Sequence, residues 1–178
     1  MEKEDRKGLI IVHTGNGKGK TTAAMGLALR SVGYHFKTLM IQFIKGTWHY
    51  GELDAVKKLH PYFEIVPMGN GFVRFGKETN SEHRLAVIEA WNFFKERMQS
   101  NEFDMIILDE INYAIDYQFI SIEEVLDALL SKPDELHLVL TGRNAHPRII
   151  EMADLVTEMR ESKHPFQKGL QAQRGIEF

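Results

Sequence analysis

The chain has 178 residues, of which 43% are hydrophobic and 26% are charged, a composition that is typical of a globular protein and argues against intrinsic disorder. Its 22 basic and 25 acidic residues give a net charge of −3, which argues against a protein that binds nucleic acid by general charge attraction. The absence of cysteine excludes disulfides, thiolate zinc sites, iron–sulfur clusters and cysteine nucleophiles.

The chain is expected to form a single cytoplasmic domain over residues 1–178. Its length suits one domain, and no internal repeat or Ser/Gly linker divides it. Residues 1–8 form a charged segment that lacks the apolar region of a signal peptide, and residues 163–178 form a polar tail. No stretch approaches the ~20 apolar residues of a membrane span, so no membrane association is expected.

Short apolar runs alternate with helix-favouring segments along the chain. In chain order, the predicted elements are a strand at 9–12, a helix at 21–30 stopped by Gly33, strands at 38–43 and 63–66 with a helix near 53–59 between them, a helix after a capping box at 79–82, a strand at 105–108, a capped helix at 121–130, a strand at 136–140, a helix at 147–153 and a strand at 155–159. The apolar stripe predicted to face the core in the helix after 79–82 is Val87, Ile88, Trp91, Phe94 and Met98. The alternation predicts a three-layer α/β domain with a mostly parallel sheet.

A Gly-rich segment lies between the first predicted strand and the first predicted helix, which is where a phosphate-binding P-loop must lie. Its residues are Thr14, Gly15, Asn16, Gly17, Lys18, Gly19, Lys20, Thr21 and Thr22. Backbone N–H groups and the helix N-terminus attract polyphosphate there, and Lys20 adds a point charge. Thr21 or Thr22 can offer a hydroxyl to Mg²⁺. The strict P-loop pattern has glycine at the position of Thr14, but the placement disfavours an incidental surface turn.

Two later strands are followed by charged residues at the same predicted edge of the sheet. Asp109 and Glu110 resemble a Walker B element, and either carboxylate can hold Mg²⁺ directly or through water. The alternative is an acidic pair that simply begins a surface loop. Arg143 follows the strand at 136–140, and its guanidinium matches the oxygens of a terminal phosphate. A surface salt bridge is the alternative for Arg143.

Together with other segments, these motifs resemble the ATP:corrinoid adenosyltransferases, a P-loop family of cob(I)alamin adenosyltransferases. The segments that carry the resemblance are 14–22, 42–48, 108–113, 141–143, 153–159, 163–166 and 169–176. The resemblance implies a RecA-like P-loop NTPase domain that transfers the 5′-deoxyadenosyl group of ATP to Co(I) of a corrinoid and releases triphosphate. It gives Lys20, Lys18 and Arg143 the catalytic role of acting on the charge of the leaving triphosphate.

The resemblance also implies binding residues for both substrates. Arg30 matches a family position near the nucleoside. The residues expected at the corrinoid are Phe72, Phe75, Trp48 and Tyr113. Family members often carry a second aromatic residue two positions after the one that Phe72 matches, where this chain has Arg74, so Phe75 is the candidate for that role. Ordinary core packing is the alternative for all four aromatic residues.

The resemblance further implies ATP as co-substrate, Mg²⁺, a homodimer and a reduced flavoprotein as a possible electron donor. Three other functions stay open on the residues alone. They are an ATPase in which Glu110 positions water, a small-molecule kinase, and a nucleotide-gated module that binds another protein. An ATPase would release ADP and phosphate, whereas an adenosyltransferase would release triphosphate. A kinase would need an Arg-rich lid, and no such segment is evident.

Overall fold

The computed structural model describes residues 6–46, 49–71 and 79–177. The described residues form a six-stranded sheet with the order β3-β2-β4-β5-β1-β6, in which every neighbouring pair is parallel. The strands are β1 (Ile10–Thr14), β2 (Thr38–Gln42), β3 (Phe63–Pro67), β4 (Met105–Asp109), β5 (His137–Thr141) and β6 (Leu155–Glu158). Every strand predicted from the sequence is therefore present.

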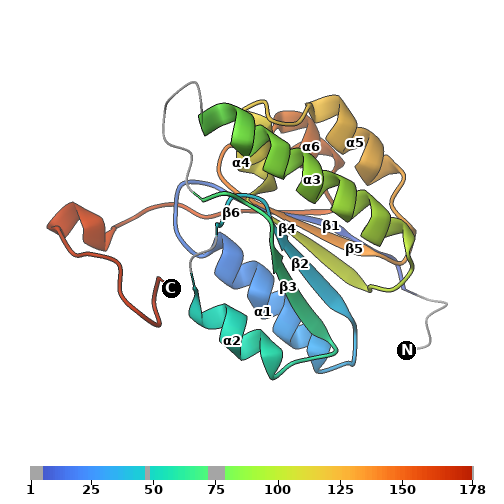
Figure 1. The fold of residues 1–178 in the computed structure, drawn as a ribbon, viewed down its shortest axis with the longest axis horizontal. Coiled ribbons are helices and arrows are strands. Elements are labelled where there is room, and N and C mark those ends of the chain that lie inside the picture. The colour runs from blue at the N-terminus through green and yellow to red at the C-terminus, as the bar shows by residue number, and fades with distance from the viewer. Residues whose placement is uncertain (1–5, 47–48, 72–78, 178) are drawn as a thin grey trace.

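Helices cover both faces of this sheet (Figure 1). One face carries α1 (Lys20–Val32) and α2 (Gly51–Lys57), and the other carries α3 (Thr79–Gln99), α4 (Ile111–Asp116), α5 (Ile122–Leu130) and α6 (Pro147–Met152). The short 3₁₀ helix η2 (Pro165–Lys168) belongs to a C-terminal tail that extends away from the sheet (Figure 1). The prediction of a three-layer α/β domain is confirmed.

Local sequence signals account for several helix ends. The side chain of Ser121 accepts a hydrogen bond from the backbone N–H of Glu124, so α5 begins with the predicted cap. Gly33 ends α1, and Pro147 opens α6 where its missing N–H costs nothing. The sequence analysis predicted neither α4 nor η2, because helices of six and four residues are too short to display a hydrophobic period; α6, also of six residues, was predicted from Pro147 instead.

The buried face of α3 differs from the prediction at one residue. Val87, Trp91, Phe94 and Met98 are at most 3% exposed, whereas Ile88 is 41% exposed. The prediction that Ile88 faces the core is therefore wrong. With 3.6 residues per turn, Ile88 lies about 100° around the helix from Val87, outside the stripe that the other four residues form.

Most of the predicted site residues lie in the segments that follow the carboxyl ends of the strands. β2, β4, β5 and β1 are consecutive in the sheet, so the loops that follow them lie in one row.

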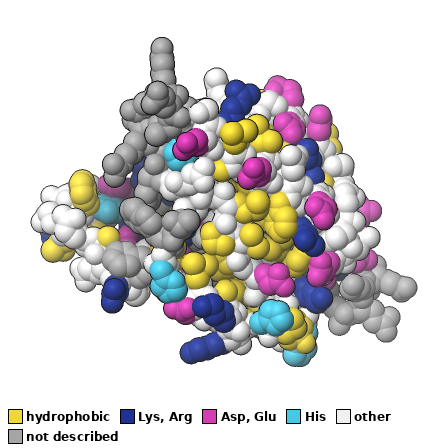
Figure 2. Space-filling model, viewed as in Figure 1, with side chains coloured by type: hydrophobic (Ala, Val, Ile, Leu, Met, Phe, Trp, Pro, Cys, Tyr) yellow, Lys and Arg dark blue, Asp and Glu magenta, His cyan; other side chains and the backbone are white. Residues whose placement is uncertain are grey.

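Hydrophobic side chains gather in the middle of the face seen in Figure 2, where Figure 1 shows β3 and its neighbours, and charged side chains surround them. Within the described parts of the chain, no helix has the length and apolar character needed to cross a bilayer.

Candidate active site

The P-loop folds against the chain that follows β6. Gly15 and Gly19 have φ angles of 95° and 105°, a left-handed conformation that side-chain-bearing residues rarely adopt. A Cβ on Gly15 would lie 2.5 Å from the carbonyl oxygen of Met159. The N–H of Gly17 donates to that same oxygen at 2.7 Å. Glycine is therefore required here by both backbone conformation and space.

Thr14, which departs from the strict P-loop pattern, has a structural role at the end of β1. Its Oγ1 accepts a hydrogen bond from the backbone N–H of Ala145 at 3.2 Å. This bond connects the start of the P-loop to the loop after β5. Glycine has no side chain that could make this connection.

Lys20 begins α1 and is 8% exposed. Its Nζ donates to the carbonyl oxygens of Gly15 and Gly17, each at 2.8 Å, and so holds the loop closed around the ammonium. Burial lowers the pKa of Lys20, and the nearby positive charge of Arg143 lowers it further, while Glu110 has the opposite effect. Both acceptors of this ammonium are uncharged carbonyl oxygens. A polyphosphate would supply charged oxygen atoms, which form stronger hydrogen bonds with an ammonium.

Asp109 connects the P-loop helix to the acidic strand end. The side chain is fully buried, and its Oδ1 accepts hydrogen bonds from the hydroxyls of Thr21 and Thr141, each at 2.8 Å. The amide of Gln42 donates to Oδ2 at 3.4 Å. Two motifs that are 88 residues apart in the chain thus meet in one hydrogen-bonded network.

The oxygen atoms of Thr21 and Asp109 are the kind of ligands that Mg²⁺ prefers. Among the described residues there is no group of three His, Asp or Glu side chains that could hold a metal. Mg²⁺ does not need such a group, because it is usually bound by one or two carboxylates together with substrate phosphates and water. The donor set therefore fits Mg²⁺ that arrives with a nucleotide.

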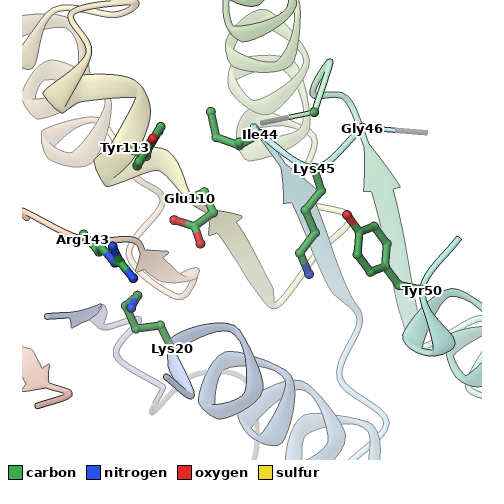
Figure 3. A pocket seen from close by; sticks show the side chains of 9 residues that line it. Lys20, Ile44, Lys45, Gly46, Tyr50, Glu110, Tyr113 and Arg143 are labelled. Carbon is green, nitrogen blue, oxygen red and sulfur yellow. The ribbon is translucent and has the colours of Figure 1, made fainter. Parts of the chain in front are cut away.

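Glu110, the residue after Asp109, lies beside this network. Its φ of 65° is unusual for a residue with a side chain, and its N–H donates to the hydroxyl of Thr141 at 2.9 Å. Figure 3 shows the carboxylate between Arg143 and Lys45, facing Lys20. Burial is the main cause that raises the pKa of Glu110, and the charge of Asp109 adds to it.

Because the pKa of Glu110 is raised in the folded state, its ionised form lowers the free energy of unfolding. Stability from this group is fully present below its ordinary pKa of 4.5 and is lost as the pH rises through the higher pKa of the folded state. We expect Glu110→Gln to raise the melting temperature at about pH 7, with the gain narrowing toward about pH 5. Thermal unfolding followed by circular dichroism at several pH values tests this, with Glu96→Gln on the exposed side of α3 as control. A lower melting temperature for Glu110→Gln at neutral pH would contradict it.

Two cavities adjoin at the P-loop lysine. The first has a volume of about 360 Å³ and is lined by Lys20, Ile44, Lys45, Gly46, Tyr50, Gly71, Glu110, Tyr113 and Arg143. The second, of about 530 Å³, is lined by Lys18, Gly19, Lys20, Thr21, Thr22, Met25, Lys45, Gly51, Glu52, Ala55, Glu110, Gly175, Ile176 and Glu177. In the first cavity, the hydroxyl of Tyr113 donates to that of Tyr117 at 2.8 Å, and burial raises the pKa of Tyr113 to about 12.

The structure brings most of the predicted polar site residues together. Lys20, Thr21, Glu110 and Arg143 each line at least one of the two cavities, Tyr113 lines the first, and Asp109 lies behind them, hydrogen-bonded to Thr21. Of the remaining P-loop residues, Thr22 lines the second cavity, Asn16 is exposed, and Lys18 forms an ion pair with Glu177 of the tail.

Four predicted residues are not placed at the site. Arg30 is exposed in the last turn of α1, at the opposite end of that helix from the P-loop. It lines neither of the two cavities as the described residues define them. Trp48, Phe72 and Phe75 lie outside the described residues.

Sequence reasoning missed the residues that follow β2. Ile44, Lys45 and Tyr50 line the first cavity, and Lys45 also lines the second. The available signal was their position after a predicted buried strand, because ligands in parallel sheets bind beyond the carboxyl ends of the strands. Ile44 and Lys45 lie in the segment 42–48 that carries the family resemblance, but the sequence analysis assigned no role to either residue.

Comparison with known proteins gives a consistent family. A family model described as ATP:corrinoid adenosyltransferase BtuR/CobO/CobP matches residues 6–178. A corrinoid adenosyltransferase of Escherichia coli K12 is 40% identical over 98% of this chain and 88% of its own length. One from Sinorhizobium sp. is 44% identical over 99% of this chain and 83% of its own length. The corrinoid adenosyltransferase CobA of Salmonella typhimurium is 38% identical, again over 98% and 88%.

Proposed function

Because this chain belongs to the ATP:corrinoid adenosyltransferase family and transfers the adenosyl group of ATP to a corrinoid, we propose that the sheet edge around Lys20 carries this reaction. One observation above all supports the assignment. Lys20 lines a cavity that also contains Ile44 and Tyr113, and the next residue, Thr21, is hydrogen-bonded to Asp109. A triphosphate and an apolar reaction partner can thus meet at one place.

The reaction sets the demands on the protein. Co(I) of the corrinoid attacks the 5′ carbon of ATP, a cobalt–carbon bond forms, the C5′–O bond breaks, and triphosphate leaves with the electron pair. Because the substrate supplies the nucleophile, the protein needs none of its own, which agrees with a chain that lacks cysteine. The remaining work is to align the two substrates and to stabilise a highly charged leaving group.

Each part of the charged network has a role in this proposal. Lys20 and the P-loop N–H groups bind the triphosphate, and Lys18 and Arg143 add positive charge at its two sides. Thr21 and Asp109 would hold Mg²⁺, which when bound would neutralise phosphate charge. Glu110 faces Lys20, whose ammonium is held by the carbonyl oxygens of Gly15 and Gly17.

The corrinoid is proposed to approach the first cavity. Its volume of about 360 Å³ suits a small group, so the much larger corrin ring would lie across the opening, with Tyr113 and Ile44 against it. The expected roles of Phe72, Phe75 and Trp48 at the corrin stay predictions. The role of Arg30 near the nucleoside also stays a prediction.

Product analysis tests the proposed function. Purified protein is mixed with ATP, Mg²⁺ and chemically reduced cob(I)alamin, without air and in the dark. We expect the visible spectrum of light-sensitive adenosylcobalamin together with one equivalent of inorganic triphosphate. ADP and orthophosphate without a new cobalt–carbon bond would instead identify an ATPase. Cob(II)alamin with no reductant is the control, since it lacks the nucleophilic electron pair.

We also propose that the protein is a homodimer, as the resemblance implies. Support comes from β6, an edge strand of the sheet in which all four residues are exposed, including Leu155 at 47% and Val156 at 37%. Such edges are usually covered in native proteins. Light scattering is expected to give twice the 20.5 kDa of one chain, and Val156→Lys is expected to shift the mass toward one chain. The reduced flavoprotein donor and the cytoplasmic location stay predictions.

A further inference from the structure

Lys45 is a second lysine at the site, outside the P-loop motif. The segment that carries it is fixed by backbone hydrogen bonds on both sides. The N–H of Phe43 donates to the carbonyl of Asp109 at 3.0 Å, and the N–H of Gly71 donates to the carbonyl of Ile44 at 2.9 Å. The place where Lys45 leaves the backbone is therefore set by the sheet and by the chain after β3.

The ammonium of Lys45 is held at the site by three neighbours. Its Nζ lies 3.0 Å from a carboxylate oxygen of Glu52, 3.9 Å from one of Asp109, and 4.8 Å from the centre of the Tyr50 ring. The side chain is 21% exposed. An ammonium has three N–H donors, and Glu52 alone lies within hydrogen-bond distance among these neighbours. Lys45 can therefore donate to a ligand without giving up Glu52.

Lys45 lies where the two cavities meet. Among the residues that the structure describes, Lys20, Lys45 and Glu110 line both cavities. Figure 3 shows Lys20 and Lys45 entering from opposite sides, with the carboxylate of Glu110 between them. These three residues form a wall that the two cavities share. A triphosphate that extends from the P-loop into the first cavity must run alongside this shared wall. Lys20 and Arg143 lie on one side of the Glu110 carboxylate in Figure 3 and Lys45 lies on the other, so Lys45 can act on negative charge of the ligand that those two cations do not face.

We propose that Lys45 binds the triphosphate of ATP from the side opposite Lys20 and stabilises it as the C5′–O bond breaks. This inference rests on the proposed function. It assigns to Lys45 a direct contact with the substrate rather than a role in the fold alone. The neighbours Glu52 and Tyr50 then act as positioning residues that hold the ammonium toward the shared wall.

Binding of inorganic triphosphate tests this proposal directly. Its dissociation constant is measured by calorimetry, and its inhibition constant against ATP is measured in the adenosylation assay. We expect Lys45→Ala to weaken triphosphate binding by about 10- to 100-fold, as for the loss of a hydrogen bond to a charged group, and to leave adenosine binding within about twofold. Lys45→Arg should keep part of the affinity. Lys58→Ala, which removes the same charge from the exposed end of α2, is the matched control and should bind triphosphate like the wild type.

The outcomes separate this proposal from the one on which it rests. Unchanged triphosphate binding in Lys45→Ala, with binding lost in Lys20→Ala, would overturn the role of Lys45 and leave the nucleotide site intact. A raised KM for the corrinoid in place of weaker triphosphate binding would also overturn it. Unchanged binding in both variants would remove the proposed site itself. Lys45→Met, which keeps the aliphatic stem over Tyr50, replaces Lys45→Ala if the alanine variant does not fold.

Discussion

Lys20→Ala is expected to lower kcat/KM for adenosylation by about 10²- to 10³-fold, the cost of losing one preorganised group that faces developing charge. Lys20 is 8% exposed and its ammonium already donates to backbone carbonyls, so little side-chain entropy is lost when ATP binds. Its removal also leaves the carbonyls of Gly15 and Gly17 without their donor. Both ATP affinity and the chemical step should therefore suffer.

The measurement is the initial rate of adenosylcobalamin formation from chemically reduced cob(I)alamin at varied ATP. Lys18→Ala is the matched control, because Lys18 belongs to the same loop but its side chain is 47% exposed and paired with Glu177. We expect a loss of at most about 10-fold for Lys18→Ala, since exposed charges are screened. Equal losses in the two variants would contradict a special role for Lys20. Turnover close to wild type in Lys20→Ala would remove the P-loop assignment.

Asp109→Asn is expected to lower kcat by about 10²-fold and to raise the Mg²⁺ concentration needed for half-maximal activity. The carboxylate accepts from the hydroxyls of Thr21 and Thr141 and from the amide of Gln42. Asparagine keeps the size of the side chain but brings an N–H₂ group into a site whose neighbours are donors. The substitution removes the charge that would hold the metal and disturbs the orientation of Thr21.

Activity measured as a function of Mg²⁺ checks this prediction, with circular dichroism to confirm the fold. Glu110→Gln is the comparison, because the carboxylate of Glu110 faces Lys20 and Arg143, whereas that of Asp109 accepts the hydrogen bond from Thr21. We expect the Mg²⁺ midpoint to move strongly for Asp109→Asn and little for Glu110→Gln. Thr21→Val, which keeps the shape but loses the hydroxyl, should move the midpoint in the same direction as Asp109→Asn. A midpoint that moves only for Glu110→Gln would give the metal to that residue.

Local patterns in the sequence were enough to predict the architecture and the P-loop. A buried parallel strand appears as an apolar run, and an N-cap appears as a serine three residues before an acidic one, as at Ser121. A P-loop depends on neighbours in sequence, since Gly15, Gly19 and Lys20 act within a few residues of one another. Asp109 was found for the same reason, because it follows its strand directly.

Contacts between segments far apart in the chain could not be predicted in this way. Three contacts show this. Ala145 donates to Thr14, Lys18 pairs with Glu177, and Lys45 lies near Asp109. Each contact joins segments that are separate in the sequence. No periodicity or spacing encodes such distances. The contacts of Thr14 with Ala145 and of Lys45 with Asp109 follow from strand order, which makes β2, β4, β5 and β1 neighbours and so gathers the residues after them.

By itself, the sequence determined a parallel α/β sheet with a phosphate-binding loop and an acidic strand end, because these features depend on residues close together in the chain. The tertiary structure alone decided that Asp109, and not Glu110, meets the hydroxyl of Thr21. It also decided that Lys45 faces Lys20 across a shared wall between two cavities. The physical reason is that side chains from different strands become neighbours only when backbone hydrogen bonds fix the order and register of the sheet.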